Sequence, residues 1–108
     1  MKNDILNWSE TLALCNNNEA LAHELIGMLK TDLPMQKQIL LDAYTRQDTR
    51  TLRDIVHQIL GSCSYIALPQ LKEAAACMHT AIHNNQENLE RERHTLIQAI
   101  DNAILLKL

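Results

Sequence analysis

The segment DTRTLRDIVHQILGSCSYI, residues 48–66, carries the clearest structural signal in the chain. On a helical wheel of about 100° per residue, its apolar side chains fall within roughly 60° of Leu52. These side chains are Leu52, Ile55, Val56, Ile59, Cys63 and Ile66. The pattern predicts an amphipathic helix that begins with Asp48 or Thr49 as its cap and runs to about residue 65 or 66.

The opposite face of this predicted helix is polar and holds His57 at about 140° and Gly61 at about 180° from Leu52. The same sector also holds Ser64, Asp54 and Arg53. Glycine inside a helix costs about 0.5–1 kcal/mol relative to alanine, so its place one turn after an outward histidine indicates that another molecule approaches there. A neutral imidazole offers a nucleophilic ring nitrogen near pH 7. We therefore interpret His57 as a candidate nucleophile, and a merely solvated surface histidine stays open as the alternative.

Three further segments have helical spacing of apolar residues. Residues 18–44 contain Leu21, Leu25, Met28, Leu29, Met35, Ile39 and Ala43, residues 69–83 contain Leu71, Ala74, Ala75, Met78 and Ile82, and residues 89–104 contain Leu89, Leu96, Ile97, Ile100, Ala103 and Ile104. Pro34 is expected to kink or split the first of them, whereas Pro69 suits a first helical position. Residues 5–15 predict a short helix anchored by Trp8. The fold expected is all-α: an antiparallel up-down four-helix bundle with a short extra N-terminal helix, forming one domain over residues 1–108.

The composition agrees with an aliphatic helical core, because the chain of 108 residues is 46% hydrophobic but only 3% aromatic and contains no Phe. A net charge of −3 without a basic run argues against a nucleic-acid partner. Cys15, Cys63 and Cys77 are too far apart for a paired metal motif, and we expect them to be small core residues in a reducing compartment. No signal peptide, membrane-length apolar run or lipidation motif is visible, so direct membrane contact is not expected.

The sequence contains no glycine-rich phosphate loop and no kinase motif, so we expect no ATP site and no enzymatic activity of the chain itself. His79 and His83 are four residues apart, a spacing that can bind zinc on a helix. A third ligand is not evident near them, and a surface pair is the favoured interpretation. We therefore predict no metal site, and a metal-binding bundle ranks last among the functional hypotheses.

The segment HQILGSCSY, residues 57–65, resembles the signature of histidine phosphotransfer (HPt) domains, in which a phosphoacceptor histidine is followed four residues later by glycine and then a small residue. The following LPQL, residues 68–71, is also similar to the family. Together they look most like the C-terminal HPt domain of BarA/GacS-type hybrid sensor histidine kinases.

This resemblance implies a phosphorelay carrier in which His57 is the phosphoacceptor and Gly61 provides clearance. His57 would accept a phosphoryl group from the receiver-domain aspartate of a hybrid histidine kinase and pass it to a response-regulator receiver aspartate. No cofactor is expected on this chain, because the partner receiver would hold the Mg²⁺. We expect the isolated domain to be monomeric and cytoplasmic, as the C-terminal domain of an inner-membrane sensor kinase would be. An apolar rim of Leu60, Tyr65 and Ile66 is the predicted docking surface for the receivers.

Two positions depart from the family pattern. Many members have a lysine three residues after the histidine, where this chain has Leu60. Many have a glutamine on the next helix that orients the acceptor ring, where this chain has His79. His79 is expected to take over that orientation, which would make the site pH-sensitive. Leu60 leaves room for an alternative hypothesis: a non-catalytic helical-bundle interaction module with a degenerate phosphoacceptor site.

Overall fold

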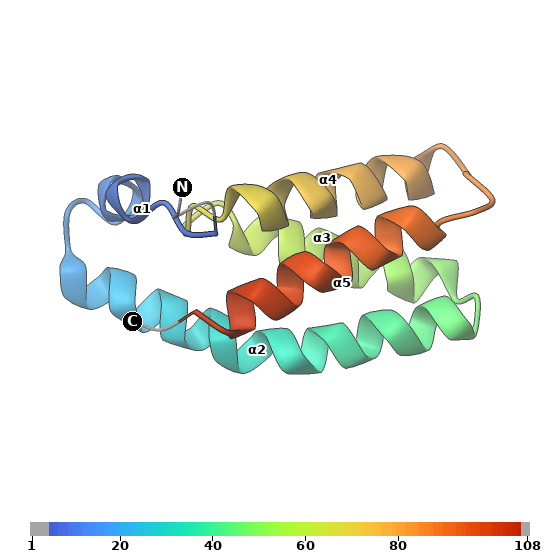
Figure 1. Ribbon diagram of the computed structural model, residues 1–108, viewed down its shortest axis with the longest axis horizontal. Coiled ribbons are helices and arrows are strands. Elements are labelled where there is room, and N and C mark those ends of the chain that lie inside the picture. Colours follow the sequence, from blue (N-terminus) through green and yellow to red (C-terminus); the bar gives the residue numbers. More distant parts are fainter. Residues whose placement is uncertain (1–4, 107–108) are drawn as a thin grey trace.

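The computed structural model describes residues 5–106, and these residues form five α-helices. The helices are α1 (Trp8–Leu14), α2 (Glu19–Thr45), α3 (Thr49–Ser62), α4 (Pro69–His83) and α5 (Glu90–Ile104). Helices α2 to α5 form an elongated antiparallel bundle, and α1 lies at the end where α2 begins (Figure 1). Helix α2 packs on α3 and α5, and α4 packs on the same two helices. The expected four-helix bundle with a short extra N-terminal helix is confirmed.

Short polar side chains begin three of the helices, as the sequence predicted for α3. The Oδ1 atoms of Asn7, Asn18 and Asp48 accept hydrogen bonds from the backbone N–H groups three residues later at 3.0, 3.0 and 3.1 Å. Each bond satisfies an amide that has no partner within its helix. Helix α4 instead starts with Pro69 in its first turn, where the missing N–H is harmless. Because the helices begin at these residues, the polar loops lie at the ends of the bundle.

The core between the four long helices is aliphatic. The buried residues of α4 and α5 follow the predicted spacing, and the largest side chains that are almost fully buried include Leu33, Leu40, Ile59, Leu71, Met78, Leu96 and Ile100. Ile97 and Ile104 are only partly buried and pack against the margin of this core. Burial of this aliphatic surface supplies most of the driving force for folding.

Helix α2 buries a different set of residues from the one that the sequence predicted. Its core positions are Ala22, Ile26, Leu29, Leu33, Leu40 and Ala43. Met28 and Met35 are 55% and 67% exposed, and Leu21 and Ile39 are also exposed, so these regularly spaced apolar side chains do not fill the core. The cause is that α2 carries two apolar stripes at helical spacing, and only one of them can face α3, α4 and α5.

Pro34 does not split α2, which is one continuous helix from Glu19 to Thr45. The ribbon changes direction about halfway along its length (Figure 1). Proline has no N–H to donate to the carbonyl of Lys30 one turn earlier, and a bend is the usual result. Separately, the side-chain ammonium of Lys30 donates a hydrogen bond to the carbonyl of Leu106. This bond attaches the segment after α5 to α2.

Helix α3 ends at Ser62, earlier than the predicted residue 65 or 66. The hydroxyl of Ser62 donates to the carbonyl of Gln58 at 3.2 Å, and the thiol of Cys63 donates to the carbonyl of Ile59 at 3.6 Å. Side chains that bond back to the preceding turn compete with continuation of the helix. Tyr65 therefore lies outside the helix, in the loop that leads to α4.

Helix α1 is fastened to this loop by backbone and side-chain hydrogen bonds. The N–H of Asn7 donates to the carbonyl of Ala67 at 2.9 Å, and the N–H of Ala67 donates to the buried hydroxyl of Thr11 at 3.0 Å. Trp8 is half-buried, and its ring lies 4.9 Å from that of His23 on α2. The predicted anchoring of this helix by Trp8 thus occurs against α2.

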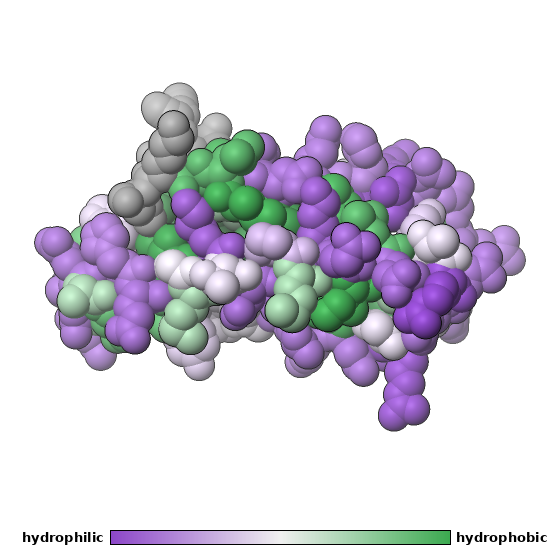
Figure 2. Space-filling model, turned by 90° about the horizontal axis from the view of Figure 1, so that it is seen from below, coloured by the Kyte–Doolittle hydropathy of each residue, from purple (hydrophilic) through white to green (hydrophobic). Residues whose placement is uncertain are grey.

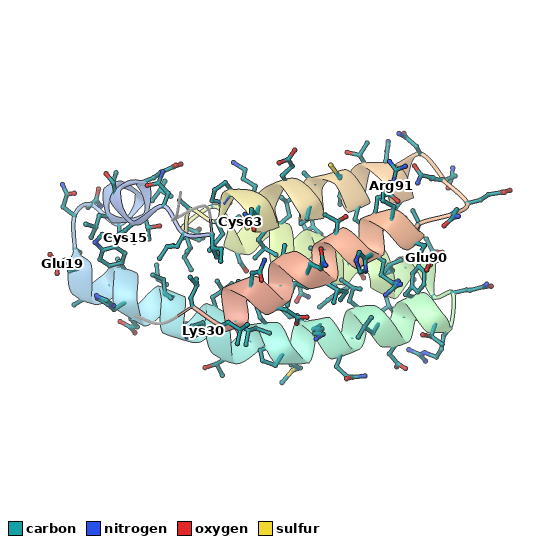
Figure 3. All side chains as sticks on the ribbon, viewed as in Figure 1. Cys15, Glu19, Lys30, Cys63, Glu90 and Arg91 are labelled. Carbon is teal, nitrogen blue, oxygen red and sulfur yellow. The ribbon has the colours of Figure 1, made fainter. Side chains whose placement is uncertain are left out.

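Two of the three cysteines are core residues, as predicted. Cys15 follows α1 and Cys63 follows α3, and both are buried (Figure 3). Cys77 on α4 is exposed, so the prediction that it fills the core is wrong. It lies on the side of α4 that faces α5, beside Glu73 and Arg91. None of the helices in residues 5–106 combines the length and the apolarity needed to cross a membrane.

Candidate functional site

His57 lies in the middle of α3 with its side chain exposed to solvent. Val56 and Ile59, on either side of it in the chain, are fully buried. The core therefore fixes the rotation of α3 about its axis, and this rotation turns position 57 outward. A rigid helix thus presents the imidazole to any macromolecule that approaches this face.

Gly61 is exposed one turn after His57, and nothing in the folded chain requires a glycine there. Its backbone is helical, and a Cβ added at this position would meet no atom within 4 Å. Glycine is therefore not needed for a tight turn or for helix packing, although it weakens the helix. The open space lies outside the molecule, on the side from which a partner would reach His57.

Helix α4 brings a second imidazole next to His57. The ring centroids of His57 and His79 are 5.8 Å apart, and the ring planes are inclined by 39°. His79 is half-buried, in the next helical position after the buried Met78. The predicted meeting of these two residues is thus observed, and it depends on the antiparallel packing of α3 and α4.

The other predicted polar site residues, two on α3 and Ser64 just after its end, are exposed and have no fixed partners among the described residues. Arg53, Asp54 and Ser64 are exposed, and no side-chain hydrogen bond or salt bridge in residues 5–106 includes them. Leu60 is half-buried and packs against the core, so only part of its side chain faces solvent. These three polar side chains are free to adjust to a partner.

Of the predicted docking rim, the structure exposes Tyr65 and buries Ile66. Tyr65 is 62% exposed, whereas Ile66 is only 3% exposed and belongs to the core. The early end of α3 explains the difference, because the chain turns after Ser62 and directs these two neighbouring side chains oppositely. Ile66 is therefore not a docking residue.

An apolar surface of α2 adjoins Tyr65, and its residues were not among the predicted site residues. Leu25 and Met28 of α2 line a shallow surface hollow of ≈130 Å³ together with Tyr65. Figure 2 looks at the α2 side of the bundle and shows apolar side chains interrupting the hydrophilic surface along its length. We call this surface the α2 stripe, and its members are Leu21, Leu25, Met28, Met35 and Ile39. The regular spacing of these residues is visible in the sequence, but spacing alone does not show that they lie on the exposed face of α2.

A cysteine near the candidate site has a strongly shifted pKa. Burial raises the pKa of the nearby Cys63 thiol to about 11, so this thiol stays protonated and unreactive at neutral pH. Within residues 5–106 no three His, Cys, Asp or Glu side chains lie close enough to hold a metal ion. His57 exposes an imidazole, which is a side chain that can act as a nucleophile.

Comparison with known proteins agrees with this geometry. The family model described as "Hpt domain" matches residues 24–105, from the first turns of α2 to the end of α5. The match contains His57, Gly61 and His79, and it leaves out α1.

Individual relatives have low sequence identity to this chain. The chain is 27% identical over 96 residues to the sensor protein GacS of Pseudomonas syringae pv. syringae, and 26% identical over 103 residues to the signal transduction histidine-protein kinase BarA of Escherichia coli K12. These matches cover 89% and 94% of this chain but only 11% of either relative.

A solved structure shows the same fold. The crystal structure of the HPT domain from a sensor hybrid histidine kinase of Shewanella superposes with a TM-score of 0.87, at 24% identity, over 94% of this chain and 88% of that one. Because the family model covers most of the chain and the fold agrees, the chain belongs to the Hpt domain family.

Proposed function

We propose that this chain carries a phosphoryl group on His57 between the receiver domains of a two-component phosphorelay. The observation that supports the proposal most directly is the exposed, mid-helix His57 followed by an exposed Gly61 that no internal packing explains. A protein nucleophile that must enter a second protein's active site needs this combination of rigidity and clearance.

The transfer chemistry asks little of the carrier itself. The free ring nitrogen of His57 attacks phosphorus in line, the bond from phosphorus to the donor aspartate oxygen breaks, and the ring N–H proton passes to solvent. The reverse exchange with a second receiver aspartate regenerates the imidazole. Such a transition state is stabilised mainly by positioning and by neutralising charge on the phosphoryl oxygens. The receiver would supply the Mg²⁺, and this chain then needs no ATP site.

We infer that the receivers dock over the α2 stripe and the outer face of α3. Met28 shares the surface hollow with Ser62 and Tyr65, so it lies level with the end of α3. Because α2 and α3 are antiparallel, seven residues onward on α2 corresponds to about seven residues backward on α3. Met35 then lies level with His57. An exposed apolar strip that flanks a phosphoacceptor suits the apolar face of one partner helix.

The proposal is tested by transfer of a radiolabelled phosphoryl group from phosphorylated receiver domains. Wild type should acquire a label that is labile in acid and stable in base, and His57→Gln should acquire none. Because His57 is exposed, its replacement should leave the fold intact, and circular dichroism checks this. Failure of several receivers to label the folded wild type would favour the alternative, an interaction module whose binding survives in His57→Gln.

A further inference from the structure

The contact between His57 and His79 has a chemical consequence once His57 is phosphorylated. The two ring centroids are 5.8 Å apart, so a phosphoryl group on the nitrogen of His57 that faces α4 lies within reach of the neighbouring imidazole. His79 is anchored on a different helix and is half-buried, which limits its movement. The His79 side chain is therefore a polar group held on one side of the phosphoacceptor.

His79 has no competing acidic partner in the structure. The three salt bridges in residues 5–106 are Lys37–Asp101, Arg46–Asp42 and Arg93–Glu90, none of which involves it. On helical geometry the charged or titratable neighbours that face it are His57, Arg53 and Asp54 from α3, and Lys72 and His83 from its own helix. Helix α2 does not pack on α4, and α5 lies on the other flank of α4, beside Glu73 and Cys77.

Phosphorylation changes the charge beside His79 by nearly two negative units. A phosphoryl dianion favours the protonated form of an imidazole next to it, by direct attraction and by a charge-assisted hydrogen bond. For charges of −2 and +1 about 6 Å apart in water, the attraction corresponds to about a tenfold change in proton binding. The effect is this modest because the site is solvated.

We propose that His79 is the counter-charge of the phosphorylated site: it takes up a proton when His57 is phosphorylated and donates a hydrogen bond to the phosphoryl group. This inference rests on the proposed function, and it assigns to an imidazolium the charge neutralisation that Leu60 cannot provide. By linkage, if phosphorylation promotes protonation, then protonation promotes phosphorylation to the same extent. The phosphorylated form is thus favoured more strongly at low pH than at high pH.

The first experiment does not depend on any receiver. Phosphoramidate phosphorylates the domain chemically: its P–N bond breaks as phosphorus bonds to the free ring nitrogen, and ammonia leaves with the displaced ring proton. Nitrogen NMR of the labelled imidazoles then reports the protonation of each ring at about pH 7. We expect His79 to become more protonated when His57 is phosphorylated, while the exposed His83, one turn further on α4, changes much less. Equal protonation of His79 in both forms would overturn the proposal.

The second experiment separates a counter-charge from a purely structural role. The equilibrium occupancy of His57 is measured against a phosphorylated receiver between about pH 6 and pH 8, for wild type, His79→Gln and the matched control His83→Gln. The pH dependence of the receiver cancels when the occupancy of His57 in each variant is divided by the occupancy in wild type at the same pH. We expect the occupancy advantage of wild type over His79→Gln to fall by up to tenfold over this range, and His83→Gln to follow wild type.

Glutamine keeps a hydrogen-bond donor but cannot be protonated, so a ratio that does not change with pH would overturn the counter-charge role. Failure of receivers to label wild type would instead contradict the proposed function. The NMR comparison on chemically phosphorylated protein would still decide the role of His79, because it needs no partner.

Discussion

At the scale of single residues, the candidate site centres on two exposed positions of one helix face that contribute no packing to the core. His57 is exposed, and Gly61 leaves a space that no atom of the chain enters. A helical glycine that no internal packing explains, placed one turn after an outward histidine, indicates that a partner approaches there. Stability and phosphotransfer should therefore respond oppositely to a change at Gly61.

Replacing Gly61 with alanine should stabilise the free domain by about 0.5–1 kcal/mol, because alanine has the higher helix propensity and its Cβ meets no atom within 4 Å. The same substitution should slow phosphoryl transfer from receiver domains, because the methyl group occupies the approach to His57. Urea denaturation measures the first effect and rapid-quench labelling the second.

Gly27→Ala is the matched control, because Gly27 is also a helical glycine with open space around it but lies on α2. It should give a similar gain in stability with an unchanged transfer rate. Equal transfer rates for Gly61→Ala and Gly27→Ala would show that clearance at position 61 is not needed.

At the scale of the elements, the sequence predicted α3 and α4 well because each has one apolar stripe. It could not predict which stripe of α2 faces the core, because Leu29 belongs to one and Met28 to the other, and both stripes have helical spacing. The choice depends on where α3 and α5 lie, which is tertiary information. The end of α3 was also missed, because the bonds from Ser62 and Cys63 to the preceding turn compete with a pattern that otherwise continues.

The exposed α2 stripe should contribute to receiver binding and not to stability. Changing both Met28 and Met35 to glutamine keeps good helix formers, so the free energy of unfolding should change by less than about 0.5 kcal/mol. Loss of apolar burial in the complex should weaken the Kd for a receiver by roughly tenfold. Calorimetric titration with a receiver measures the binding.

Phosphorylation of this double variant by phosphoramidate should match wild type, because no docking is required. Leu105→Gln is the control: Leu105 is 73% exposed, but it lies at the end of α5, on the other flank of α2. An unchanged Kd for the double variant would place the receiver elsewhere on the bundle.

The N-cap of α3 gives the fold an acid-sensitive element. The hydroxyl of Thr51 donates to Asp48 at 2.7 Å and its N–H donates at 3.1 Å, and together they lower the pKa of this carboxyl from its ordinary 3.8. The ionised carboxylate therefore stabilises the native state above pH 3.8, and this contribution is lost as pH falls through the lower folded-state value.

Asp48→Asn keeps a capping oxygen but cannot titrate. Wild type should have the higher Tm near neutral pH, and the difference between the two proteins should shrink as the pH is lowered below about 4. Thermal unfolding followed by circular dichroism at several pH values measures this. A Tm difference that stays constant into the acid range would show that the charge of Asp48 does not contribute.

At the scale of the whole molecule, the bundle architecture could be predicted from the sequence. The contacts between residues far apart in the chain could not. Four amphipathic segments with short links allow little other than an up-down bundle. The contact of α1 with the loop before α4 could not be predicted, because it depends on a hydrogen bond between Thr11 and Ala67, which are 56 residues apart. The meeting of His57 with His79 is equally non-local, and only the resemblance to a family indicated it.

The last prediction concerns this joining of α1 to the bundle. The Thr11 hydroxyl is fully buried, accepts a hydrogen bond from the N–H of Ala67 and donates one to the carbonyl of Asn7 at 2.8 Å. Thr11→Val keeps the shape but leaves the buried Ala67 N–H without an acceptor, which should lower the free energy of unfolding by about 1–3 kcal/mol. Thr11→Ser keeps the hydroxyl and should lose less, and urea denaturation followed by Trp8 fluorescence compares the two. Because α1 lies outside the matched Hpt region, both variants should still accept a phosphoryl group on His57 under conditions in which they are folded. Equal stability of Thr11→Val and wild type would mean that the Ala67 N–H finds water instead, and that α1 is held in place by the packing of Trp8.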